Sequence, residues 1–214
     1  MRINSFLIIV CMAASFWAWQ QEPKFVEQNL VFSFNNLMQD RYWTLLTALF
    51  VHGSILHLFG NMLFLFVFGG TLENNLGSGR HLMVFLTGGL TGFLLSVPFV
   101  APDAGMVGAS AAIFTVAACV MLVRPLKFSW LFLAPQGLVA ILYFLYNAIV
   151  VYDARLVPGY DPQVAYIAHV IGFLTGIPFG IAWSDDWKKN FVITLAMLGI
   201  YVAILTVVAG ALQR

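Results

Sequence analysis

The sequence predicts an all-α protein that crosses a membrane several times. Of its 214 residues, 61% are hydrophobic and 9% are charged, whereas about 25% of the residues in soluble domains are charged. The apolar residues form continuous runs instead of alternating with polar ones, which favours helices over a transmembrane barrel. We therefore expect the lipid bilayer to be the main environment of the chain. The net charge of +1 gives no reason to expect a nucleic-acid partner.

Seven apolar runs are candidate membrane spans, because about 20 apolar residues cross a bilayer as a helix. They cover residues 3–19, 55–72, 81–101, 108–123, 130–152, 163–183 and 191–211. The fourth run is short, so we expect it to require a thin part of the bilayer or little tilt. Two connections are longer than the others, residues 20–54 and 153–162. The mixed aromatic and polar composition of 20–54 fits short interfacial helices and an ordinary extracellular loop equally well.

The distribution of lysine and arginine predicts a cytoplasmic N-terminus. One side of the membrane receives Arg2, Arg80, Arg124, Lys127, Lys188 and Lys189, and the other receives Lys24, Arg41, Arg155 and Arg214. The first run could alternatively be a cleaved signal peptide. We expect it to be retained, because it is long enough to span and lacks a small-x-small cleavage site.

Four polar residues within the runs are predicted to lie at one depth. His57 and Asn61 lie in the first turns of the second run, four residues apart, and face the same way. Ser110 lies in the first turn of the fourth run, and His169 lies about two turns into the sixth. In the predicted orientation all four fall in the outer half of the membrane. Unexplained polar groups at this depth are functional candidates, and a serine with a histidine suggests a nucleophile and its base.

Small residues predict that the fourth and sixth runs pack against each other. After its histidine the sixth run carries three glycines spaced four residues apart, Gly172, Gly176 and Gly180. The serine face of the fourth run continues through Phe114, Ala117 and Ala118. If these two faces meet, Ser110 and His169 come within reach of each other. Stripes of small residues also serve ordinary helix packing, so they do not indicate a site by themselves.

Each polar residue has an ordinary structural explanation as well. A lone serine in a membrane helix usually bonds to a carbonyl of its own helix, and a lone histidine or asparagine often only joins helices. His52 and His57 have no carboxylate nearby and make a poor metal site, so no metal is expected. No Asp or Glu shares the membrane depth of Ser110, so we expect a Ser-His dyad without the third member of a triad.

Four short motifs occur in order between residues 40 and 183. They are His52-x4-His57-x3-Asn61-Met62, Gly70-Thr71-Leu72-Glu73 with Gly77-Ser78-Gly79-Arg80, Gly108-Ala109-Ser110, and Ala168-His169-x2-Gly172-x3-Gly176. Together they resemble the motifs of the rhomboid intramembrane serine protease family. The resemblance implies a rhomboid-like bundle of six transmembrane helices over residues 1–184, which includes the long first loop 20–54. Residues 185–214 would then form an additional C-terminal transmembrane helix.

The resemblance also implies catalytic roles. Ser110 would be the nucleophile, and His169 would be the general base and later the acid for the leaving amine. His57, Asn61 and the backbone N–H of Ser110 would stabilise the oxyanion. The substrates would be transmembrane segments of other membrane proteins, and no cofactor is implied.

Supporting roles follow for five further residues. Gly108 would leave room for the sharp turn into the fourth helix. Phe114 stands where the family often has a tyrosine whose ring packs on the base histidine. Gly172 and Gly176 would belong to the helix-packing motif, and Glu73 would hold the cytoplasmic turn after the second helix.

The chain departs from the family pattern at two places. The family motif is commonly Gly-x-Ser-Gly, but here Ala111 follows the serine, and its methyl group is expected to narrow the pocket. The Trp-Arg pair of the first loop appears here as Trp43-Thr44, with Arg41 two residues earlier. This change affects the expected anchoring of the loop more than the chemistry.

Two other functions fit parts of the pattern. An inactive rhomboid-like protein would bind membrane clients without cutting them, but such relatives usually lack the serine or the histidine, and both are present here. A transporter or channel would place polar residues along a path through the membrane, whereas here they gather at one depth. We expect a multi-pass protein of a bacterial cytoplasmic membrane.

Overall fold

The structure, a computed structural model, describes residues 2–161 and 164–212. Apolar helices lie at all seven predicted runs: α1 (Ile3–Ala18), α5 (Ile55–Phe64), α7 (Ser78–Ser96), α8 (Ser110–Val123), α9 (Gln136–Tyr152), α10 (Tyr166–Trp183) and α11 (Trp187–Leu212). The second run continues from α5 through the π-helical segment η1 (Leu65–Gly69) into α6 (Gly70–Leu76). By length and composition, Ile55–Leu76, Ser78–Phe99, Tyr166–Trp183 and Trp187–Leu212 can each cross a membrane, while α1, α8 and α9 are shorter. The predicted class of all-α membrane protein with several spans is confirmed.

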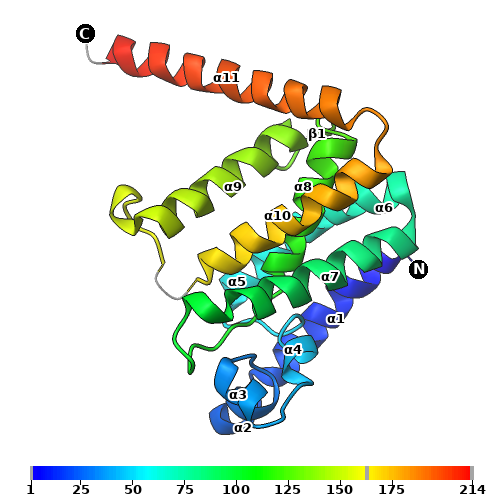
Figure 1. Cartoon of the computed structure of the whole chain (residues 1–214), viewed down its shortest axis with the longest axis vertical. Helices are drawn as coiled ribbons and strands as arrows, with labels where there is room; N and C mark the ends of the chain where they lie inside the picture. The colour runs from blue at the N-terminus through cyan, green and yellow to red at the C-terminus, as the bar shows by residue number, and fades with distance from the viewer. Residues whose placement is uncertain (1, 162–163, 213–214) are drawn as a thin grey trace.

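Helix α8 is the central helix of the bundle (Figure 1). Helices α7, α9 and α10 pack around it, and every side chain from Ala111 to Leu122 is buried. Its 14 residues extend about 21 Å, less than the roughly 30 Å of the hydrocarbon layer. Because little of α8 faces lipid, its length does not have to match that layer. The enclosure explains the short fourth run without the thin bilayer that the sequence suggested.

The glycine face of α10 lies directly against the backbone of α8. A Cβ atom on Gly172 would overlap the carbonyl oxygen of Ala111, and one on Gly176 would overlap that of Thr115. The two helices are also joined by a hydrogen bond, in which the Thr115 hydroxyl donates to the carbonyl of Gly172 at 2.7 Å. The predicted packing of these two helices is therefore confirmed.

The first loop folds into short helices. They are α2 (Pro23–Asn29), α3 (Phe34–Met38) and α4 (Thr44–Thr47), which form a small lobe at one end of the molecule (Figure 1). The short helices expected for 20–54 are therefore present, and their place at the membrane interface stays a prediction. Arg41 holds the lobe together, since its guanidinium donates to Oδ1 of the buried Asn36 at 2.9 Å. The shifted arginine therefore still anchors the loop, while Trp43 is exposed.

The fifth span begins later than predicted. Residues 128–135 form a small antiparallel hairpin of β1 (Phe128–Ser129) and β2 (Ala134–Pro135), and α9 begins only at Gln136. Pro135 explains the late start, because it is extended in the structure and a residue before proline disfavours the helical conformation. The short 3₁₀ helices η2 (Val97–Phe99) and η3 (Ala154–Leu156) follow α7 and α9. The predicted start of the sixth run at residue 163, and Arg214, lie outside the described residues.

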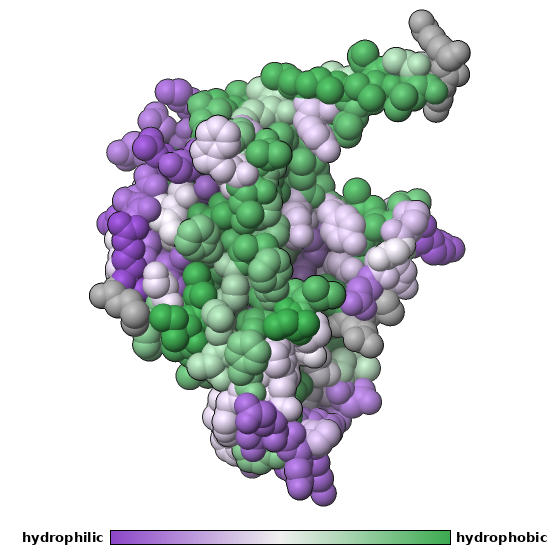
Figure 2. Space-filling model, turned by 180° about the vertical axis from the view of Figure 1, so that it is seen from behind, coloured by the Kyte–Doolittle hydropathy of each residue, from purple (hydrophilic) through white to green (hydrophobic). Residues whose placement is uncertain are grey.

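The outer surface is suited to lipid. Figure 2 shows an apolar surface over the middle of the molecule, with hydrophilic residues gathered at its margins. Large apolar side chains such as Phe59, Phe66 and Leu95 are exposed, which is expected where the solvent is hydrocarbon. Helix α11 diverges from α9 (Figure 1), and Thr194 is the one buried residue between Trp187 and Leu212.

Both cysteines are internal. Cys11 on α1 and Cys119 on α8 are free thiols with no exposed surface. Each lies in the main apolar core of the bundle, so they act as small hydrophobic side chains.

We predict that Gly176→Ala destabilises the bundle by about 1–3 kcal/mol, the usual range for overpacking. The added methyl group would meet a backbone carbonyl and Cβ of Ala118, which cannot move aside cheaply. The measurement is thermal unfolding in detergent. Gly199→Ala on α11 is the matched control, because a Cβ there has no neighbour within 4 Å; equal unfolding temperatures for the two variants would contradict the prediction.

Candidate active site

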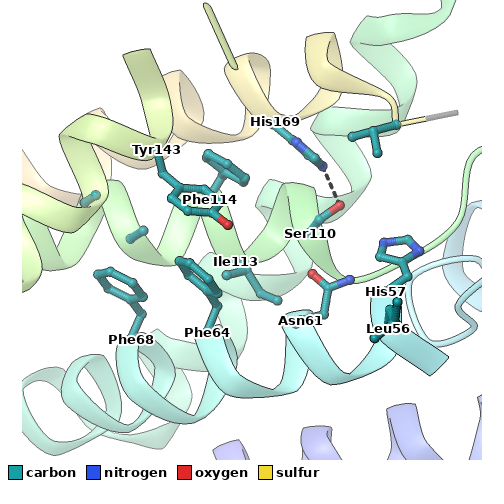
Figure 3. A pocket seen from close by; sticks show the side chains of 14 residues that line it. Leu56, His57, Asn61, Phe64, Phe68, Ser110, Ile113, Phe114, Tyr143 and His169 are labelled. Carbon is teal, nitrogen blue, oxygen red and sulfur yellow. Dashed lines mark hydrogen bonds between the residues drawn. The ribbon is translucent and has the colours of Figure 1, made fainter. Parts of the chain in front are cut away.

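Ser110 and His169 come together across the contact between α8 and α10. Ser110 is the first residue of α8, and its Oγ lies 2.7 Å from Nε2 of His169, as the dashed line in Figure 3 shows. His169 lies in the first turn of α10, not two turns in, because that helix begins at Tyr166. The close approach of the two backbones is what allows these short side chains to meet.

Gly108 makes the sharp turn into α8. Its φ of +109° lies where other residues are strained, and its N–H donates to the carbonyl of Ala48 at 2.8 Å. A Cβ at this position would also lie 2.8 Å from Nε2 of His57. Glycine is therefore required here both by the backbone and by the space around it.

His52 supports the same turn from the first loop. Its Nε2 accepts a long hydrogen bond of 3.4 Å from the N–H of Ala109, and its Nδ1 lies 3.0 Å from Oγ of Ser15 on α1. Burial, and secondarily the neighbouring His57, lower the pKa of His52 to about 3, so its ring is neutral and can accept. Within residues 2–161 and 164–212, no three His, Cys, Asp or Glu side chains form a group that could hold a metal ion.

His57 and Asn61 lie on the side of Ser110 that faces away from His169 (Figure 3). Both project from α5, whose start is capped by Ser54, because the Ser54 hydroxyl accepts the N–H of His57 at 3.1 Å. Nδ2 of Asn61 is buried and has no hydrogen-bond partner in the described part of the chain. A buried donor left unsatisfied is costly, and the first N–H groups of a helix also lack partners within it. His57, Asn61 and Ser110 line the same pocket, so these donors border one space beside the serine.

The ring of His169 is held by two further side chains. Phe114 stacks on it, with ring centroids 4.7 Å apart and planes inclined by 10°. Oδ1 of Asn147, on α9, lies 2.7 Å from Nδ1 of the histidine. Asn147 is not among the residues predicted from the sequence, because only carboxylates were considered as a third member of the site. The signal was available, since Asn147 is a polar residue within the fifth apolar run.

An apolar pocket opens beside the serine. It is lined by rings from three directions, with Phe64 and Phe68 from the second span, Phe114 from α8 and Tyr143 from α9 (Figure 3). Ala111 is not among the lining residues. Its methyl group instead faces Gly92 on α7, where a Cβ would collide with it. The expectation that Ala111 narrows the pocket is therefore wrong, because Gly92 provides the room for the methyl.

Glu73 lies near the opposite end of the second span from His57. Its carboxylate accepts the N–H groups of Ile3 and Asn4 at 2.8 and 3.2 Å and the hydroxyl of Ser78 at 2.6 Å. It therefore ties the start of α1 to the turn between α6 and α7. His81 contacts the same region, with Nε2 3.1 Å from Oδ1 of Asn4.

Comparison with known proteins places the site within a known domain. Residues 39–186 match the model of the Rhomboid domain family. This segment includes all four motifs and extends from the first-loop lobe to the end of α10.

Named relatives include both a protease and an inactive protein. RHOMBOID-like protein 7 of Arabidopsis thaliana is 32% identical over 152 residues, which are 69% of this chain and 46% of the relative. The rhomboid protease GluP of Bacillus subtilis is 41% identical over 78 residues, 36% of this chain and 15% of the relative. Inactive rhomboid protein 2 of Homo sapiens is 28% identical over 181 residues, 77% of this chain and 19% of the relative.

The chain spans less than half the length of these relatives. Several of the similar proteins are from Arabidopsis thaliana, and two of these plant proteins are named as mitochondrial. The expected bacterial cytoplasmic membrane is therefore not supported. The family model covers more than half of the chain. This chain therefore belongs to the rhomboid family.

Proposed function

We propose that the chain is an intramembrane serine endopeptidase that cleaves transmembrane segments of other membrane proteins. The observation that carries the proposal is the 2.7 Å contact between Oγ of Ser110 and Nε2 of His169. A serine hydroxyl is a weak nucleophile unless a base takes its proton, and this distance suits that transfer. A serine with only a structural role would not need an imidazole nitrogen at this distance.

The proposed reaction passes through an acyl-enzyme. Oγ of Ser110 attacks the peptide carbonyl carbon while its proton moves to Nε2 of His169. The carbonyl oxygen becomes an oxyanion that accepts hydrogen bonds from Asn61, His57 and the N–H of Ser110. The C–N bond then breaks as His169 returns the proton to the leaving amine. Water, deprotonated by His169, hydrolyses the ester, which releases the new carboxylate and restores Ser110.

The surroundings of the serine support a membrane substrate. The pocket beside Ser110 is lined mainly by apolar side chains, which suits side chains of a transmembrane segment. In the proposed topology the N-terminus is cytoplasmic, the site lies toward the outer face, residues 1–184 form the catalytic core and residues 185–214 add one transmembrane helix. An inactive client-binding protein is the alternative, since one relative is named inactive. The paired Ser110 and His169 favour the enzyme, because binding alone does not require them.

We predict that a serine-directed fluorophosphonate labels the protein in detergent and that Ser110→Ala and His169→Ala abolish the labelling. The first variant removes the nucleophile and the second removes its base. Ser96→Ala is the matched control, because Ser96 is a buried serine of α7 that only bonds the carbonyl of Gly92. Labelling that persists in Ser110→Ala would exclude this nucleophile, and a wild type that is never labelled would favour the binding protein.

We also predict that His57→Ala and Asn61→Ala each slow cleavage of a model transmembrane substrate by about 10²–10³, the usual cost of one oxyanion donor. Both variants should remain folded, since the Asn61 amide nitrogen bonds to no described residue and His57 is only half-buried. Cleavage is followed on gels with purified protein, and thermal unfolding serves as the control for folding. Wild-type rates in both variants would remove these residues from the proposed oxyanion site.

A further inference from the structure

We propose that Asn147 is a positioning residue that completes a Ser-His-Asn arrangement by fixing the tautomer of His169. This inference rests on the proposed function. Asn147 is a buried residue of α9, and its amide lies between the His169 ring and the carbonyl of Tyr143. Its Oδ1 lies 2.7 Å from Nδ1 of His169, and its Nδ2 donates to the carbonyl of Tyr143 at 2.7 Å.

The contact with Tyr143 fixes which way the amide points. A carbonyl oxygen can only accept, so the amide nitrogen must face it. With the amide reversed, Oδ1 would face the Tyr143 carbonyl as two acceptors at hydrogen-bond distance, and Nδ2 would face the histidine. The main chain of α9 thus directs Oδ1 of Asn147 toward His169.

The amide in turn fixes the proton on the imidazole. Oδ1 of Asn147 carries no proton, so Nδ1 of His169 must be the donor in their hydrogen bond. A neutral imidazole has one protonated nitrogen, which leaves the lone pair on Nε2. That lone pair faces the hydroxyl of Ser110, which is the tautomer that a general base needs.

Asn147 fixes which edge of the His169 ring faces Ser110, which the stacking on Phe114 cannot do. Stacking fixes the plane of the His169 ring but not which edge faces Ser110. A 180° rotation about the Cβ–Cγ bond exchanges the two edges and leaves the stack in place. The hydrogen bond from Nδ1 to Asn147 distinguishes the two edges. When Ser110 transfers its proton to Nε2, the proton on Nδ1 stays in place and continues to donate to the amide, which takes up no proton itself. An asparagine with this role occurs in the Cys-His-Asn arrangement of papain-like proteases.

The first test compares amide replacements on α9. Asn147→Leu removes the acceptor, and Gln136→Leu is the matched control, because Gln136 is a second buried amide of α9 at the other end of the helix. We expect Asn147→Leu to lower both the rate of fluorophosphonate labelling and kcat by about 10- to 100-fold, the range found for residues that orient metal-binding histidines, with KM little changed. Asn147→Asp keeps an acceptor oxygen and should restore most of the rate. Equal rates in Asn147→Leu and Gln136→Leu, or no rescue by Asp, would overturn the proposal.

The second test reads the tautomer directly, and its deciding result comes from the wild-type protein. ¹⁵N NMR of imidazole-labelled wild-type protein distinguishes protonated from unprotonated ring nitrogens, and the chain has only four histidines. The signal of His169 is assigned by its loss in His169→Ala. We expect a proton on Nδ1 of neutral His169 in the wild type and a loss of this preference in Asn147→Leu. A proton on Nε2 in the wild type would overturn the proposal. If the wild type is not labelled by fluorophosphonate, the proposed function fails, while the NMR result still tests the hydrogen bond.

Discussion

The glycine face of α10 allows its backbone to touch that of α8, and the position of every group around Ser110 depends on this contact. At Gly172 and Gly176 there is no room for a single methyl group. Side chains of ordinary size would move the helices apart by several ångströms, and a hydrogen bond of 2.7 Å between Ser110 and His169 would be lost. In a bilayer, the hydrophobic effect does not drive helices together, because lipid tails are as apolar as the helix surfaces. The dispersion contacts made by this close approach therefore hold the helices together.

A second set of contacts fixes how the chain enters α8. Gly108 supplies a backbone conformation that other residues avoid, Ala48 accepts its N–H, and His52 accepts the next N–H along the chain. Both partners, Ala48 and His52, belong to the first loop, between α4 and the start of α5. The first loop therefore has a structural part in the site although it contributes no side chain to the apolar pocket. The burial that keeps His52 neutral is what allows its ring to accept a backbone N–H.

The sequence predicted those features that the membrane environment requires. Lipid requires continuous apolar helices, so the seven runs could be found from composition, and Ser110, His169, His57 and Asn61 stood out as polar exceptions within them. The start of α9 was misjudged because residues 130–133 are apolar enough to extend the run, whereas in the folded chain the helix begins only after Pro135. Asn147 was missed because its partner depends on the rotation of α9 about its own axis, which composition does not reveal. The role of Ala111 was misjudged because the space for its methyl comes from Gly92, a residue of another helix.

The burial of Cys11 and Cys119 has a practical consequence for future experiments. Because neither thiol has exposed surface, both are shielded from polar maleimides and spin-labelling reagents while the bundle is folded. A single cysteine introduced at an exposed position beside the pocket, such as Leu56, then becomes the reactive one. Fluorescent or paramagnetic probes can be attached there to an otherwise native sequence, without first replacing residues of the core.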